Sequence, residues 1–112
     1  MGGPMMKLDI RPRNLDLTDR LRERIERRMH FALSRFEPRI ERVTIRLFDV
    51  NGPRGGEDKR CRIVVRVRGC EPAAVVEADR DLGTAIDRAA DRVGRVVARA
   101  LDRLTRPRRA TA

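Results

Sequence analysis

The sequence contains no tryptophan and no tyrosine, and its only aromatic side chains are three phenylalanines, 3% of the 112 residues. A hydrophobic core must therefore be built from valine, isoleucine, leucine, alanine and these three rings. Hydrophobic residues still make up 40% of the chain and recur periodically, which argues against a disordered protein. A chain of this length is expected to form one domain around one modest core.

The residues that usually carry catalysis or bind metals are also scarce. His30 is the sole histidine, and the two cysteines, Cys61 and Cys70, form neither a CxxC motif nor a cluster with histidine. The sequence shows no nucleophile–base pair, no paired carboxylates and no glycine-rich phosphate loop. We therefore expect a protein that is not an enzyme, with no catalytic residue, metal, cofactor or small-molecule substrate. His30 is expected at the surface, and both cysteines as small buried or half-buried thiols.

Long apolar runs are absent as well. The sequence contains no run of about 18 apolar residues, the length needed to span a membrane. The opening MGGPMM also lacks the charged and apolar regions of a signal peptide. We therefore predict a cytoplasmic protein without a membrane partner. Residues 1–5 are predicted to be a flexible leader, residues 6–106 the folded domain, and residues 107–112 a basic flexible tail.

Lysine is nearly missing too, because Lys7 and Lys59 are the only lysines among 27 basic residues and the rest are arginines. With 17 acidic residues, the chain has a formal net charge of +10. An excess this large in a small domain predicts a polyanionic partner, and we favour nucleic acid over an anionic membrane surface.

Periodicity predicts six elements in the order β-α-β-β-β-α. Strands are predicted at 6–12, 40–50, 61–68 and 73–78, with residues 51–59 as a loop. Thr18 is predicted to cap a first helix that stops at Glu37-Pro38, and Asp81 a second helix that runs from Leu82 towards Pro107. Each helix has one apolar stripe. The fold class is therefore predicted to be α+β, with a four-stranded sheet that includes an antiparallel meander and two helices on one face.

The second helix presents a ridge of arginines. At 100° per residue, its basic side chains fall within an arc of about 80° opposite the apolar stripe; they are Arg88, Arg92, Arg95, Arg99, Arg103 and Arg106. A solvated face would mix charges of both signs, because like charges four residues apart repel. Asp91 can pair with Arg95, but we expect most of the charge to be uncompensated. This pattern favours a surface that binds phosphates over an ordinary wet face.

The first helix and the sheet carry weaker signals. Arg20, Arg24, Arg27 and Arg35 share a helical face, diluted by glutamates, with Arg22 and Arg28 beside the apolar stripe. Phe31 falls within that face; we expect a partly covered ring at the sheet edge rather than a platform for stacking a base. Arg46, Arg62, Arg66 and Arg68 make the open sheet face basic, either as a second contact or as the wet side of the sheet.

Two segments together resemble the ribosome hibernation promoting factor family, which includes ribosome-associated inhibitors formerly described as sigma-54 modulators. The segment MKLDIRPRNLDLTDRLRERIERRM resembles the opening of the family. The segment EADRDLGTAIDRAADRVGRVVARALDR resembles the family signature Asp-Leu-x-x-Ala-Ile-Asp followed by a basic helix, here Asp81, Leu82, Ala85, Ile86 and Asp87. The similarity covers residues 6–106 and is that of a short form.

The resemblance implies a fold like that of double-stranded-RNA-binding domains and a specific partner. It implies binding to 16S rRNA of the small ribosomal subunit, in the decoding channel between head and body. A protein bound there would block mRNA and tRNA. Ribosomes would thus be kept idle in stationary phase or stress. The family's basic positions match Arg92, Arg95, Arg99 and Arg103, and in the first helix Arg22 and Arg28. The free protein is expected to be a monomer.

The chain also departs from the family's usual pattern at three positions. Gly83 and Arg35 stand where tyrosine is usual, and Phe31 where lysine is usual. Two other functions stay open from the residues themselves: a general RNA- or DNA-binding protein without preference for ribosomes, and a regulator that binds an acidic protein.

Overall fold

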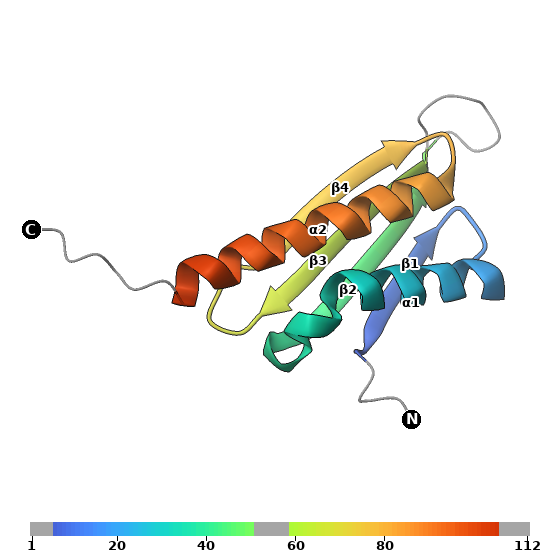
Figure 1. Cartoon of the computed structure of the whole chain (residues 1–112). Helices are drawn as coiled ribbons and strands as arrows, with labels where there is room; N and C mark the ends of the chain where they lie inside the picture. The colour runs from blue at the N-terminus through green and yellow to red at the C-terminus, as the bar shows by residue number, and fades with distance from the viewer. Residues whose placement is uncertain (1–5, 51–58, 106–112) are drawn as a thin grey trace, which may run out of the picture.

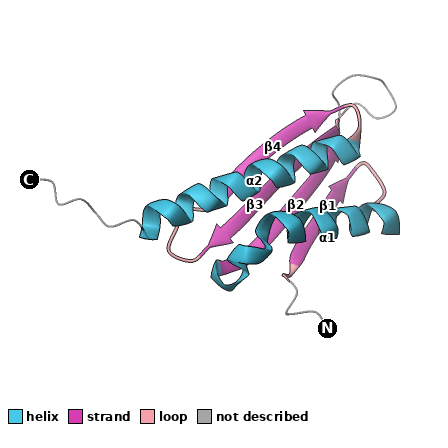
Figure 2. Cartoon of the chain, in the orientation of Figure 1, coloured by secondary structure: helices cyan, strands magenta, loops and turns pink. Residues whose placement is uncertain are grey.

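The computed structural model describes residues 6–50 and 59–105. The predicted leader 1–5, the loop 51–58, Arg106 and the tail 107–112 lie outside the described residues. The element order is β1 (Leu8–Arg13), α1 (Asp19–Leu33), the 3-10 segment η1 (Ser34–Arg39), β2 (Ile40–Asp49), β3 (Lys59–Val67), β4 (Ala73–Asp79) and α2 (Leu82–Thr105). This confirms the predicted α+β fold and its order of strands and helices (Figures 1 and 2).

The four strands form one mixed sheet in the order β1-β2-β3-β4. Strands β2, β3 and β4 make the predicted antiparallel meander, whereas β1 pairs with β2 in parallel. β1 runs from Leu8 through Pro12 to Arg13, one residue beyond the predicted end at residue 12. Proline is tolerated there because β1 is an edge strand, in which one side of the backbone needs no hydrogen-bond partner.

Both helices lie on the same face of the sheet (Figure 1). The sheet contributes alternating side chains that are fully buried, among them Val43, Ile45 and Ile63, and the helices contribute Met29 and Val93. This alternation is the one predicted for β2 and β3. Burial of each apolar side chain contributes roughly 1.5–3 kcal/mol, so one shared core holds the helices on the sheet.

Both predicted helix caps are present. The side chain of Thr18 accepts a hydrogen bond from the Leu21 N–H at 3.1 Å, and that of Asp81 accepts one from the Thr84 N–H at 3.0 Å. The predicted end of the first helix at Glu37-Pro38 was wrong. The α-helix ends at Leu33, and a 3-10 segment continues past Pro38, whose fixed φ suits that conformation.

The two helices approach closely at Gly94. A Cβ atom on Gly94 would lie 3.1 Å from the carbonyl oxygen of Ala32 and 3.3 Å from its Cβ. A glycine inside a helix costs about 1 kcal/mol relative to alanine, and this contact explains its presence. Gly94 therefore sets the spacing between α1 and α2, and with it the surface that the two helices share.

Candidate nucleic-acid interface

The predicted arginine ridge lies on the outer side of α2. We use this name for the five exposed arginines that the structure describes there, Arg88, Arg92, Arg95, Arg99 and Arg103. The opposite side of the helix, including Ile86 and Val97, is buried in the core. The sixth predicted member, Arg106, lies outside the described residues.

The first half of the ridge is partly neutralised by β4, contrary to the expectation of mostly uncompensated charge. The Nη1 atom of Arg92 lies 2.8 Å from Oε2 of Glu77, and Nη1 of Arg88 lies 3.5 Å from Oδ1 of Asp79. Both carboxylates are on β4, which packs beside α2 in the fold. The sequence alone could not bring these charges together, because they are 9 and 15 residues apart.

The second half of the ridge keeps more of its charge. Arg95 pairs with Asp91 at 2.6 Å through the predicted i,i+4 spacing. No carboxylate in residues 6–50 or 59–105 pairs with Arg99 or Arg103. Exposed ion pairs contribute only about 0–1 kcal/mol, so a phosphate could replace the partners of the paired arginines. Arg99 and Arg103 could bind a phosphate without giving up a carboxylate partner among the described residues.

On α1, the two predicted site residues have different surroundings. Arg22 is exposed, whereas Arg28 is held by α2: its Nε atom lies 3.0 Å from Oδ1 of Asp87. Arg24 binds the same carboxylate with two hydrogen bonds, 2.7 Å from Nη2 and 3.2 Å from Nε. Sequence reasoning missed this pair, which joins residues 63 positions apart.

The contact between Arg24 and Asp87 has clear electrostatic consequences. The hydrogen bond from Arg24 lowers the pKa of the Asp87 carboxyl, against the opposing effect of its partial burial, and the same bond raises the pKa of Arg24. Gly83 makes room for this arrangement, because a Cβ there would lie 2.7 Å from the Arg24 guanidinium. The absence of a side chain at Gly83 therefore fits the presence of Arg24 beside it.

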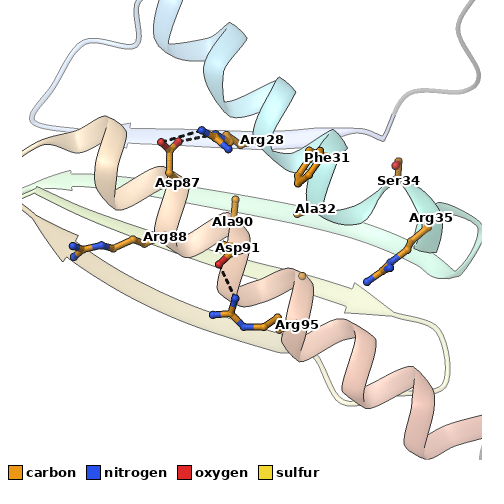
Figure 3. Close-up of a pocket in the computed structure, with 11 residues that line it drawn as sticks. Arg28, Phe31, Ala32, Ser34, Arg35, Asp87, Arg88, Ala90, Asp91 and Arg95 are labelled. Atoms are coloured by element: carbon orange, nitrogen blue, oxygen red, sulfur yellow. Dashed lines mark hydrogen bonds and ion pairs between the residues drawn. The ribbon is translucent and has the colours of Figure 1, made fainter.

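A pocket of about 500 Å³ opens between α1 and α2, bordered by arginines and by Phe31 (Figure 3). Phe31 is 84% exposed. The prediction of a partly covered ring at the sheet edge was therefore wrong. The buried side of α1 carries Ile25, Met29 and Leu33. Phe31 therefore lies on the side of α1 that faces away from the sheet.

The open face of the sheet is a second basic surface. Arg11, Arg46 and Arg62 stand directly opposite one another on β1, β2 and β3, and Arg42 stands opposite Arg66. Like charges in such positions destabilise a sheet. The carboxyl of Asp9 lies 2.8 Å from Arg11 and 4.0 Å from Arg42. A hydrogen bond from Arg11, followed by the charges of Arg11, Arg42 and Arg46, lowers the pKa of Asp9.

The described residues carry few features of other kinds of site. Among them no group of three histidine, cysteine or acidic side chains could hold a metal ion, and no helix is long and apolar enough to cross a membrane. His30 is exposed, Cys70 is half-buried, and Cys61 is buried, which raises its thiol pKa to about 12.

The fold and these surfaces define a small α+β domain with two arginine-rich faces. The sequence model of the family described as sigma 54 modulation protein / S30EA ribosomal protein matches residues 8–105. The chain belongs to this family, and is by that membership a ribosome-associated modulation factor.

Solved structures agree with this assignment. The N-terminal domain of Protein Y from Thermus thermophilus is 31% identical, with a TM-score of 0.67 over 86% of this chain and 98% of that one. A ribosomal subunit interface protein from Coxiella burnetii has the same fold, with 15% identity and a TM-score of 0.66 over 82% of this chain and 93% of that one. No curated protein matches the sequence.

Proposed function

We propose that this protein binds 16S rRNA of the small ribosomal subunit in the decoding channel between head and body, and so excludes mRNA and tRNA. Family membership supports the ribosomal partner. The signature Asp-Leu-x-x-Ala-Ile-Asp and the basic helix after it resemble those of hibernation factors. This resemblance supports the decoding channel as the binding site. The bound protein would keep ribosomes idle in stationary phase or stress, as a cytoplasmic protein that is monomeric when free.

The observation that carries the proposal is the unpaired charge at the end of α2. Arg99 and Arg103 are exposed, four residues apart on one side of the helix, and none of the described carboxylates pairs with them. Guanidinium groups bind phosphates with two parallel hydrogen bonds. Such contacts position a protein on RNA without reading its sequence, so binding would depend on shape and charge.

Co-sedimentation with purified small subunits tests the proposal. We expect R99E/R103E to abolish binding at a salt concentration at which the unchanged protein binds fully. The matched control is R60E/R66E, which makes the same change in net charge on the open sheet face and should bind more tightly than R99E/R103E. Equal loss in both variants, or binding unchanged in R99E/R103E, would contradict the assignment of the site to α2.

Two further measurements separate this function from its alternatives. An excess of bulk RNA duplex should not displace the protein from small subunits; displacement would indicate a general nucleic-acid binder. Binding to subunits should also fall steeply with salt, because each phosphate contact releases counterions. A cellular partner that stays bound after nuclease treatment and contains no rRNA would indicate a regulator of an acidic protein.

A further inference from the structure

Phe31 is an exposed aromatic ring on a surface made mostly of charge. It is 84% exposed, the highest value among the large hydrophobic side chains described. Arg28 and Arg35 lie three residues before it and four after it, and all three border the pocket between the helices. An apolar ring in this position gains little from burial in the core, and it lies beside arginines that could bind a phosphate.

The pocket beside Phe31 has a volume of about 500 Å³ and is lined by both helices. On the α2 side the pocket is lined by two aspartates and two arginines, Asp87, Asp91, Arg88 and Arg95 (Figure 3). The small residues Ala32, Ala90 and Gly94 also line the pocket, and the helices approach closely at Gly94. The resulting surface offers one aromatic ring beside four arginines, two of which, Arg28 and Arg95, pair with Asp87 and Asp91.

The chemistry of this surface fits an unpaired nucleotide. A nucleotide joins a flat aromatic base to a phosphate, and thus needs a ring to stack on and a cation within a short distance. Phe31 supplies the ring, and Arg35 and Arg95 supply cations that line the same pocket. Arg35 now lies 4.7 Å over the Phe36 ring and Arg95 pairs with the exposed Asp91, so a phosphate would replace these surface contacts. A base in a duplex is already stacked on both sides and cannot present its face, whereas a base in a loop or single strand can.

We propose that Phe31 is the stacking platform for an unpaired RNA base, with the adjacent phosphate bound by Arg35 and Arg95. This inference rests on the proposed function, since it names the feature of the RNA that the helical face recognises. Stacking on the uncharged ring would add an apolar contact to a surface whose other contacts with RNA are electrostatic.

The absence of tryptophan and tyrosine makes a direct test possible. In F31W, the introduced indole is the sole strongly fluorescent side chain in the protein. We expect a single-stranded oligoadenylate to quench its fluorescence, and an RNA duplex of equal length to leave it nearly unchanged. V76W is the matched control, because Val76 is 47% exposed and lies on the open sheet face. Quenching that is equal in F31W and V76W, or absent from F31W, would overturn the proposal.

Affinity gives a second, independent readout. Stacking of one base on an aromatic side chain corresponds to a loss of about 5- to 150-fold when the ring is removed. We expect F31A to bind oligoadenylate more weakly within that range, and F31Y to restore binding. The dependence of affinity on salt should be the same in F31A and the unchanged protein, because the ring carries no charge. An altered salt dependence, or full affinity in F31A, would contradict a stacking role.

The same variants distinguish failure of this inference from failure of the proposed function. If F31A binds small subunits as tightly as the unchanged protein while R99E/R103E does not bind, the inference fails and the proposed function stands. If neither variant affects small-subunit binding, the inference fails together with the assignment of the binding site to α2. Weakened binding in F31A that F31Y restores supports both.

Discussion

Arg24 and Asp87 join the two helices by a pair of hydrogen bonds between guanidinium and carboxylate, with oxygen–nitrogen distances of 2.7 and 3.2 Å. The two residues belong to different helices and lie 63 positions apart. Arg28 adds two further contacts to the same carboxylate, at 3.0 and 3.4 Å. Asp87 therefore fixes α1 beside α2, and with it the position of Phe31 relative to the arginine ridge.

Replacing Asp87 with asparagine should destabilise the domain. We expect D87N to lower the free energy of unfolding by about 0.5–1 kcal/mol after allowance for the partial exposure of Arg24, which corresponds to a fall of a few degrees in Tm. Because the pKa of Asp87 is lowered by Arg24 in the folded state, the contribution is complete above the ordinary aspartate pKa of about 3.9 and is lost as the pH falls through the folded value.

Thermal unfolding at several pH values checks this prediction. The difference in Tm between the unchanged protein and D87N should be largest at neutral pH and should become smaller below about pH 4. D91N is the matched control, since Asp91 is one turn further along α2 and its ion pair with Arg95 is largely exposed. A D91N effect as large as that of D87N would argue against a special role for the contact between the helices.

Gly94 should not tolerate a large side chain. G94L is expected to lower the free energy of unfolding by about 1–3 kcal/mol, because its side chain would collide with the backbone of Ala32 on α1. R95L places the same side chain one residue further on, at an exposed position, and should change stability much less. Denaturant unfolding gives both values. Equal stability of the two variants would show that the helices can separate freely.

The two thiols should react very differently. Cys61 is fully buried and its thiol pKa is raised to about 12 by burial, whereas Cys70 is half-buried. We expect a thiol reagent to modify one group per folded chain at pH 8, and two after denaturation. The C70S variant should show no fast reaction in the folded state. Rapid modification of C70S would mean that Cys61 is accessible.

The row of arginines across the open sheet face should reduce stability at low salt. Arg46 stands between Arg11 and Arg62, so R46T is expected to raise Tm at low ionic strength. This gain should diminish in 1 M salt, where charges are screened within about 3 Å. Arg60 stands opposite Phe48 and Ala78, and R60T is the matched control, with a smaller dependence on salt. Equal salt dependence in both variants would contradict repulsion along the row.

Features that depend on neighbours in the chain were predictable. The hydroxyl of Thr18 and the carboxylate of Asp81 cap the helices as expected, because a cap acts within three residues. The buried face of β3, including Ile63 and Val65, followed from strict alternation. The end of α1 was not predictable from Pro38, since proline fits a 3-10 segment as well as it ends an α-helix.

The sequence by itself determined the order of the elements, their apolar faces and the line of arginines along α2, because these depend on periodicity and local sterics. Only the tertiary structure decided which of those arginines are neutralised: Glu77 and Asp79 reach the ridge because β4 packs beside α2. It also decided that Phe31 stays exposed. The energy of a charge pair and the exposure of a ring depend on distances in space between segments that lie far apart in the chain, and those distances exist only after folding.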